Sequence, residues 1–150
     1  MNEETAYWIG FSAFPGIGPV RFKLLYQYFG SARAAWRAPI GELKKIGLGE
    51  KRVLDFDHFR TTWDLAGYLR ELTKFHVGVL TLTDPRYPKL LKEISDPPFV
   101  LYVKGVKTEV PLNLEKTIAV VGTRRVSTYG REVTQTLVSD LVAYGYRLRQ

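Results

Sequence analysis

Residues 117–131 read TIAVVGTRRVSTYGR, and this segment says most about the kind of fold that the chain adopts. A run of apolar and β-branched residues ends at Gly122, two arginines follow at once, and a helical pattern begins within a few residues. In α/β proteins, a parallel strand that leads through a glycine turn into a helix N-terminus is a common anion-binding element. From Lys116 to Arg131 there are four basic residues and no acidic one. The segment therefore predicts a strand, a turn and a helix, with phosphate as the ligand.

The rest of the second half, from residue 76 onward, also has a strand and helix pattern. Residues 76–82, 99–103 and 117–121 are rich in β-branched and aromatic residues, which favours strands. After the third run, apolar residues recur at helical spacing from Val133 to Tyr144, and Gly145 marks the predicted end of a helix. A strand, a basic glycine turn and an amphipathic helix, in this order, form the opening unit of a doubly wound sheet.

The first half, residues 1–75, has apolar residues at helical spacing, interrupted by glycine and proline. A helix is predicted over residues 19–29, with one face formed by Val20, Leu24, Leu25 and Tyr28. Gly30 ends this helix, and Ser31 can cap a short helix that follows. A further helical pattern runs from about residue 50 to residue 72. This half is predicted to be all-α.

A glycine turn occurs twice in the helical half. Residues 14–19 read FPGIGP, and residues 45–50 read KIGLGE, 31 residues further on. A Gly-x-Gly turn ahead of a helix lets the backbone approach a phosphate closely and directs free N–H groups at it. The paired layout resembles the tandem helix-hairpin-helix (SAM-like) modules that hold DNA backbones without reading sequence. The alternative, and the commoner role, is that both turns only connect helices. Pro19 removes one donor, and Glu50, although Lys51 and Arg52 follow it, would place a negative charge beside a phosphate.

The composition narrows the class of protein. A length of 150 residues with 45% hydrophobic content is enough for one ordinary domain or two small ones. The net charge of +7 favours a polyanionic partner such as nucleic acid without identifying it. The chain has no cysteine, which excludes a disulfide framework, a thiolate zinc site and a cysteine nucleophile. The sequence shows no signal-peptide pattern and no apolar run near the roughly 20 residues of a membrane span, so we expect a cytoplasmic protein without membrane contact.

No pattern of residues indicates catalysis, a metal site or a cofactor. His58 and His76 have neither metal-ligand spacing nor a partner for nucleophilic chemistry, and no pair of carboxylates suggests acid–base catalysis. A dinucleotide site would need a Gly-x-Gly-x-x-Gly turn, but the next glycine after Gly122 is Gly130. We therefore expect a protein that is not an enzyme and that has no catalytic residues, no metal and no cofactor.

Three motifs in the second half carry a more specific resemblance. Residues 84–91 read DPRYPKLL, residues 94–105 read ISDPPFVLYVKG, and the turn at 121–124 reads VGTR, with a Tyr-Gly pair shortly after it. In this order, the motifs resemble the DNA-processing protein A family (DprA, also called Smf). The similarity extends from about Phe11 to the last residue.

The resemblance implies a bacterial protein that binds single-stranded DNA and helps to load the RecA recombinase during natural transformation. It also implies an extended Rossmann fold that is used for DNA, without a nucleotide cofactor or catalysis, and a homodimer when the protein is full length. The expected fold class is α+β to α/β. Residues 1–75 would form the helix-hairpin-helix module, and residues 76–150 the N-terminal part of a Rossmann-like DprA domain.

Five residues are candidates for DNA contact: Gly122, Thr123, Arg124, Arg125 and Arg131. Arg124 matches the family's Gly-Ser/Thr-Arg turn and its DNA-phosphate contact. An arginine suits this role because its guanidinium can bridge two phosphate oxygens. Gly122 would allow a close backbone approach or simply make the turn. Thr123 could add a hydroxyl contact, and Arg125 and Arg131 could widen the basic surface. For each arginine the alternative is a solvated surface side chain, which for Arg124 includes pairing with a carboxylate.

Further side chains have simpler predicted roles. Ser127 is predicted to cap the helix that follows the turn. Tyr129 could stack on a base, although packing at a helix start is the commoner role. Tyr87, Phe99 and Tyr102 are predicted to belong to the core.

Members of the family continue through several more strands, with a second glycine-rich turn expected just after a strand that begins near Tyr146. The chain is therefore expected to be a fragment that carries part of a DNA site. Two alternative functions stay open. A nucleoside-monophosphate phosphoribohydrolase-type enzyme would need a later glycine-rich loop with a catalytic glutamate. A protein-interaction module without DNA binding would bind its partner in a salt-insensitive way.

Overall fold

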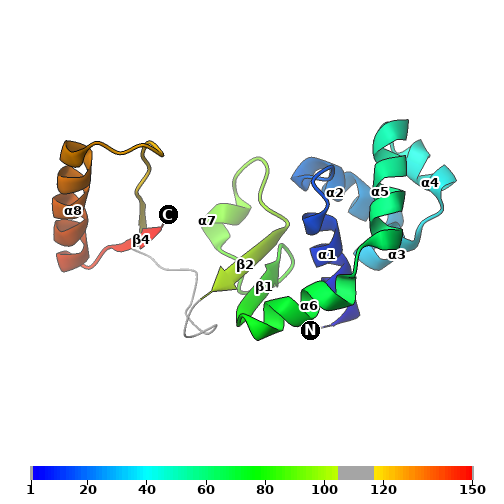
Figure 1. Ribbon diagram of the computed structural model, residues 1–150, viewed down its shortest axis with the longest axis horizontal. Helices are drawn as coiled ribbons and strands as arrows, with labels where there is room; N and C mark the ends of the chain where they lie inside the picture. Colours follow the sequence, from blue (N-terminus) through cyan, green and yellow to red (C-terminus); the bar gives the residue numbers. More distant parts are fainter. Residues whose placement is uncertain (1, 105–116, 150) are drawn as a thin grey trace. The chain divides into compact units, whose positions relative to one another are not determined.

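A computed structural model describes residues 2–104 and 117–149. Gly105 and Lys116, which belong to the motifs quoted above, lie outside the described residues. The chain divides into two compact units, a first unit of residues 1–110 and a second unit of residues 111–150. Figure 1 shows the helices and strands of each unit.

The first unit combines helices with a small sheet. Gly30 ends the predicted helix at residues 19–29 in a left-handed conformation (φ 76°), and the hydroxyl of Ser31 accepts a hydrogen bond from the Ala34 amide at 3.1 Å, as predicted. The N-terminal helix was not predicted. In chain order the described elements are α1 (Glu3–Ala13), α2 (Pro19–Phe29), α3 (Ala32–Arg37), α4 (Ile40–Lys45), α5 (Glu50–Thr62), α6 (Leu65–Lys74), β1 (Val77–Thr81), α7 (Lys89–Lys92) and β2 (Val100–Lys104).

The core of the first unit is built from aromatic rings. Phe11 of α1 and Phe56 of α5 stack with their ring centroids 5.1 Å apart, and Trp36 of α3 meets Phe11 edge to face at 5.2 Å. All three residues are buried. A Cβ atom at Gly10 of α1 would lie 2.7 Å from the Trp36 indole, so this packing leaves no room for a side chain at position 10.

The structure corrects the predicted face of α2. Val20, Leu24 and Tyr28 are 56%, 45% and 53% exposed, whereas Phe22 and Leu25 are buried. The helix carries two apolar stripes, and either one satisfies the helical spacing. The stripe that contains Phe22 is the one that faces the core, because its ring packs against Phe11 and Trp8 with centroids 5.3 and 4.6 Å apart.

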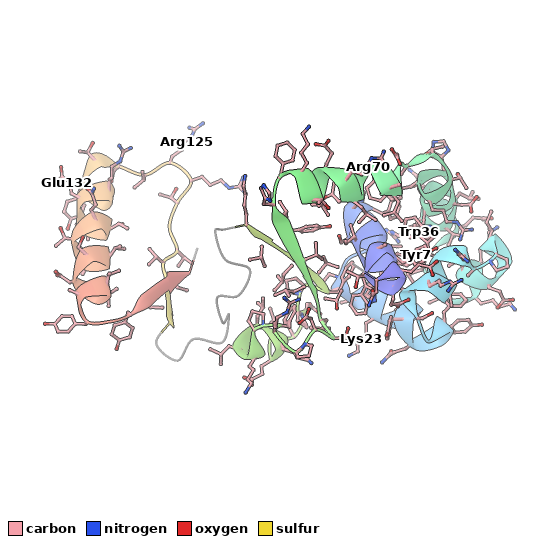
Figure 2. The ribbon with its side chains drawn as sticks, turned by 90° about the horizontal axis from the view of Figure 1, so that it is seen from below. Tyr7, Lys23, Trp36, Arg70, Arg125 and Glu132 are labelled. Carbon is pink, nitrogen blue, oxygen red and sulfur yellow. The ribbon has the colours of Figure 1, made fainter. Side chains whose placement is uncertain are left out.

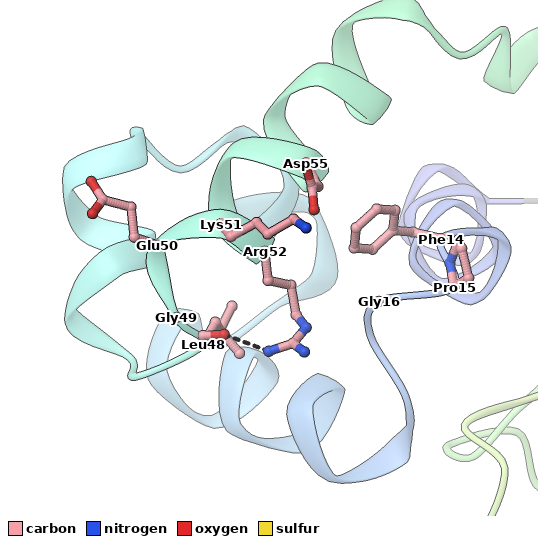
Figure 3. Close-up of a pocket in the computed structure, with 9 residues that line it drawn as sticks. All are labelled: Phe14, Pro15, Gly16, Leu48, Gly49, Glu50, Lys51, Arg52 and Asp55. Carbon is pink, nitrogen blue, oxygen red and sulfur yellow. Dashed lines mark hydrogen bonds between the residues drawn. The ribbon is translucent and has the colours of Figure 1, made fainter.

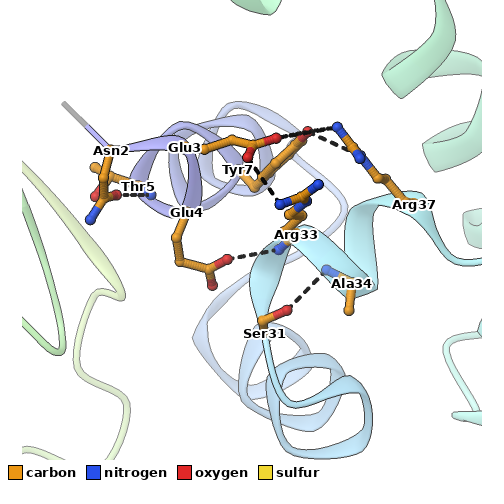
Figure 4. A network of polar contacts seen from close by, with 9 residues as sticks. All are labelled: Asn2, Glu3, Glu4, Thr5, Tyr7, Ser31, Arg33, Ala34 and Arg37. Carbon is orange, nitrogen blue, oxygen red and sulfur yellow. Dashed lines mark hydrogen bonds and ion pairs between the residues drawn. The ribbon is translucent and has the colours of Figure 1, made fainter.

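A polar network fixes α1 against the start of α3 (Figure 4). The Glu4 carboxylate accepts hydrogen bonds from the Ala32 and Arg33 amides at 2.6 and 3.1 Å. Glu3 pairs with the guanidinium groups of Arg33 and Arg37 at 3.1 and 3.2 Å. The N-terminus of α3 is therefore already neutralised by a carboxylate of the chain itself.

The first two strands pack on the helical core. β1 and β2 pair antiparallel, with Val77 opposite Lys104 and Thr81 opposite Val100. The Phe99 ring, just before β2, stacks on Phe22 of α2 with centroids 4.1 Å apart. These strands thus share one compact unit with the helices, and the predicted domains 1–75 and 76–150 stay a prediction.

The second unit is a strand, a helix and a parallel strand. In the described residues these are β3 (Thr117–Ala119), α8 (Thr128–Ala143) and β4 (Arg147–Arg149), with β3 and β4 paired parallel. Gly145 follows α8 with a φ of 80°, and its amide bonds to the Val142 carbonyl at 2.9 Å, which confirms the predicted end of the helix. The strand expected near Tyr146 is also present as β4.

The chain is an α+β protein, as predicted at the level of fold class. The helix-hairpin-helix identity of the first half and a doubly wound sheet remain predictions. Within residues 2–104 and 117–149, no helix is both long and apolar enough to cross a membrane.

Candidate nucleic-acid interface

Three hydrogen bonds shape the turn between β3 and α8. The Ser127 hydroxyl accepts from the Gly130 amide at 3.1 Å, and the Ser127 carbonyl accepts from the Arg131 amide at 3.0 Å, which confirms the predicted cap. The Thr123 hydroxyl accepts from the Arg125 amide at 3.3 Å. Thr123 therefore has an internal role in shaping the turn, and a contact with DNA stays a prediction.

Within the described part of the chain, neither the backbone conformation nor a close contact requires a glycine at position 122. It does not adopt a positive φ, and a Cβ atom there would meet nothing within 4 Å. Among the described residues, the glycines that do have a positive φ are Gly30, Gly47, Gly49 and Gly145. At Gly122, the missing side chain leaves the turn backbone open to approach from outside.

The three candidate arginines are exposed. Arg124 and Arg125 lie in the turn, and Arg131 lies in the first turns of α8. Figure 2 shows the Arg125 side chain extending outward from the turn. Among the described residues, no carboxylate forms an ion pair with any of the three. The structure thus places three exposed arginines at or near the N-terminus of a 16-residue helix, where the helix dipole also favours anions.

Tyr129 stands next to these arginines and is 76% exposed. The packing role at the helix start is therefore not seen among the described residues. The open ring face leaves the predicted stacking on a base sterically possible.

Residues 84–98, which span the first motif and the start of the second, have a structural role. Two groups of Arg86, the guanidinium at 2.7 Å and the backbone amide at 2.8 Å, donate to the Asp84 carboxylate. The Arg86 guanidinium holds the pKa of the Asp84 carboxyl below its ordinary value, against a smaller opposing effect of burial. The Tyr87 hydroxyl donates to the Pro98 carbonyl at 2.7 Å, which links the first motif to the second.

The aromatic predictions for this region were right for two residues out of three. Tyr87 and Phe99 are buried, as predicted. Tyr102 is 41% exposed, although it lies on the same face of β2 as the buried Val100. Partial burial raises the pKa of Tyr102 to about 12, although its hydroxyl bonds to Ser12.

The two glycine turns of the first unit line one groove of about 560 Å³ (Figure 3). Gly18 and Gly49 are the residues before α2 and α5, so both turns precede helices as predicted. Phe14, Pro15 and Gly16 line one side, and the other side runs from Leu48 into the first turns of α5. Sequence reasoning did not select Lys51, Arg52 and Asp55 as site residues, because nothing local shows that the two turns meet.

No group of three metal-ligating side chains occurs in the part of the chain that the structure describes. His58 and His76 lie on different elements, one within α5 and the other between α6 and β1.

Comparisons with known proteins agree on one family. Residues 78–148 match the family described as DNA recombination-mediator protein A, a region that runs from β1 through the arginine turn to β4. The protein Smf of Synechocystis sp. is 33% identical over an alignment that covers 98% of this chain. The chain belongs to the DprA/Smf family.

A second DprA/Smf relative is the DNA processing protein DprA of Bacillus subtilis, which is 34% identical over 70 residues. That alignment covers 47% of this chain and 23% of the relative. The chain spans 37% of the length of the Synechocystis Smf protein. No solved structure matches the chain significantly. Family membership thus assigns the chain to DNA-processing proteins.

Proposed function

We propose that this DprA/Smf protein is a recombination mediator that binds single-stranded DNA and helps to load the RecA recombinase in natural transformation. The family description and the names of the two relatives support a role in DNA processing and recombination. RecA, and a homodimer of the full-length protein, are proposed as partners on the family resemblance. The proposed role is one of binding, with no catalysis and no cofactor.

The observation that carries the proposal is the open arginine turn between β3 and α8. Arg124, Arg125 and Arg131 are exposed and have no carboxylate partner among the described residues, so no ion pair there must break before a phosphate binds. The amides of Thr128 and Tyr129, at the start of α8, form no hydrogen bond with described residues. Together these groups offer cations and N–H donors to a DNA backbone.

The test is the substitution Arg124→Ala, with binding to a labelled oligothymidylate measured at several salt concentrations. We expect the affinity to fall roughly three- to tenfold, as for the loss of one charge-assisted hydrogen bond. We also expect the slope of log affinity against log salt to lose about 0.7, because one phosphate contact to a single strand is removed.

The matched control is Arg70→Ala, which removes an exposed arginine from α6 in the first unit. It lowers the net charge by the same amount as Arg124→Ala. The affinity for the oligonucleotide and the slope of log affinity against log salt should stay nearly unchanged. Equal losses for the two variants would show that overall charge, and not the turn, determines binding.

A further inference from the structure

The core of the first unit leaves uncovered an outer stripe on α2, which consists of Val20, Leu24 and Tyr28. Because these residues are spaced four apart, their side chains form one row along the helix. Apolar side chains that are exposed singly are normal on a protein surface. A row of three on one helix is instead the arrangement that receives the apolar side chains of a second helix.

One end of the outer stripe is held in place by contacts with its neighbours. The Tyr28 hydroxyl donates to the Glu42 carboxylate of α4 at 3.3 Å, and the Tyr28 ring meets Phe29 edge to face with centroids 4.9 Å apart. Glu42 also pairs with the Lys45 ammonium at 2.6 Å, so its charge is balanced within α4. A partner would therefore meet a fixed aromatic ring beside a neutralised carboxylate, and little ordering of this end is needed on binding.

Basic side chains flank the outer stripe on both sides. At 3.6 residues per turn, Arg21 lies along one edge of the row and Lys23 along the other. Both are exposed, and neither forms an ion pair with the residues that the structure describes. The helix itself contains no acidic residue. The exposed face of α2 is therefore apolar along its middle and positively charged at its two edges.

We propose that the outer stripe of α2 is a docking surface for an acidic amphipathic segment of another protein. Such a segment places a row of apolar side chains on the stripe, and it places aspartate or glutamate side chains beside Arg21 and Lys23. This interaction is separate from the arginine turn of the second unit, and it does not rest on the proposed function.

The chemistry of the stripe disfavours three other occupants. A second copy bound with two-fold symmetry would place this face on itself and bring Arg21 and Lys23 of both copies together, where like charges repel. A DNA backbone would leave Val20 and Leu24 without an apolar partner. An anionic membrane would suit the cations, but three partly exposed side chains would bury little apolar area in lipid.

The first test uses a labelled synthetic peptide as the probe. The peptide is an amphipathic helix with leucine at every third and fourth position and glutamate beside these leucines. By fluorescence anisotropy at low salt, the complete 150-residue chain should bind it about tenfold more tightly than the same peptide with lysine in place of every glutamate. Equal binding of the two peptides, or no binding of the acidic one, would overturn the proposal.

Substitutions on α2 locate the binding surface. Leu24→Ala should weaken binding of the acidic peptide about five- to tenfold, because it removes the middle of the stripe. Lys23→Gln should weaken it about two- to threefold at low salt, and this loss should shrink at high salt.

The matched controls for these substitutions are Leu54→Ala and Lys51→Gln on α5. Leu54 is 49% exposed, against 45% for Leu24, and Lys51 is exposed and has no ion pair within the described residues. Both controls should leave peptide binding nearly unchanged. Losses as large as those of the α2 variants would show that the peptide binds the chain without using the stripe, and the proposal would be wrong.

Three further measurements on Leu24→Ala distinguish the other occupants. A dimer of the 150-residue chain in sedimentation equilibrium that Leu24→Ala dissociates would assign the stripe to a second copy. Binding to vesicles of phosphatidylglycerol and phosphatidylcholine that Leu24→Ala abolishes would assign it to a membrane. Weaker binding to labelled oligothymidylate would assign it to DNA. We expect none of these changes, and any one of them would overturn the proposal.

The same variants keep the two proposals apart. If Arg124→Ala weakens oligonucleotide binding and the acidic peptide does not bind, the α2 proposal is wrong and the proposed function stands. If the α2 variants weaken peptide binding and Arg124→Ala leaves oligonucleotide binding unchanged, the α2 proposal stands and the arginine turn is not the DNA site.

Discussion

The first unit buries a cluster of aromatic rings between its helices, whereas α8 of the second unit has no buried side chain among the described residues. The basic side chains of the two units also differ in how many of them pair with carboxylates. Arg33, Arg37, Lys44, Lys45, Arg60 and Arg70 of the first unit pair with carboxylates. Arg124, Arg125 and Arg131 of the second unit have no such partner in the described chain. Side chains that pack or pair within the chain contribute to its stability. Exposed side chains without such a partner are available to bind a ligand.

The largest expected effect tests the difference in packing. Phe56→Ala should lower the free energy of unfolding by about 3–5 kcal/mol, because it opens a cavity in the aromatic core. Leu137→Ala, in α8, removes a side chain that is more than half exposed and should change it by less than about 0.5 kcal/mol. The measurement is urea unfolding followed by tryptophan fluorescence. Trp8, Trp36 and Trp63 all lie in the first unit, so the signal reports that unit. A Leu137→Ala shift as large as that of Phe56→Ala would show that the two units unfold together.

Two glycine substitutions, one in each unit, test the same difference in packing. Gly10→Ala should lower the free energy of unfolding by up to about 2 kcal/mol, because overpacking against Trp36 costs about 1–3 kcal/mol and the gain in helix propensity offsets only about 1 kcal/mol of it. Gly122→Ala should leave stability within about 0.5 kcal/mol, since a Cβ there meets nothing. It should nevertheless weaken oligonucleotide binding, because the methyl group blocks the turn. If Gly122→Ala binds like the unsubstituted chain, no phosphate approaches this backbone.

The smallest expected effect concerns an ion pair of the first unit. The folded-state pKa of Asp84 is held below its unfolded value by the Arg86 guanidinium, so its contribution to stability is present above the unfolded pKa of about 3.9. It is lost as the pH falls through the lower folded pKa. Asp84→Asn should therefore remove part of the loss of stability in acid, measured as urea midpoints at pH 5 and pH 2. Asp140→Asn, in the second unit, is the control and should leave the acid dependence of the tryptophan signal unchanged. An unaltered acid dependence in Asp84→Asn would show that the pair contributes nothing.

The limits of sequence reasoning show most clearly at α2. The ends of this helix were predicted correctly because Pro19 and Gly30 act locally, through a fixed φ and a left-handed cap. Of the four residues predicted to share one face, only Leu25 is buried, because Phe22 and Val20 belong to two equally regular apolar stripes. Only the contacts of Phe22 with Trp8 and Phe99 distinguish them.

The candidate site shows the same division. The arginine turn could be located from the sequence, because the strand, the glycine, the Ser127 cap and the helix all lie within 15 residues. The groove could not, because Phe14 and Lys51 lie far apart in the chain and meet only through folding. That the two glycine turns repeat was visible in the sequence, but that they line one groove was not.

Local patterns in the amino-acid sequence thus predicted the strand–turn–helix order around Gly122, the helices α2, α3 and α8, and the membership of the DprA/Smf family. These depend on the periodicity of side chains, on glycine and proline at turns, and on short motifs. The folded structure alone decided which stripe of α2 is buried, that β1 and β2 pack on the helical core, and which cations keep no carboxylate partner. Those outcomes depend on contacts between residues distant in the chain, which local propensity does not encode.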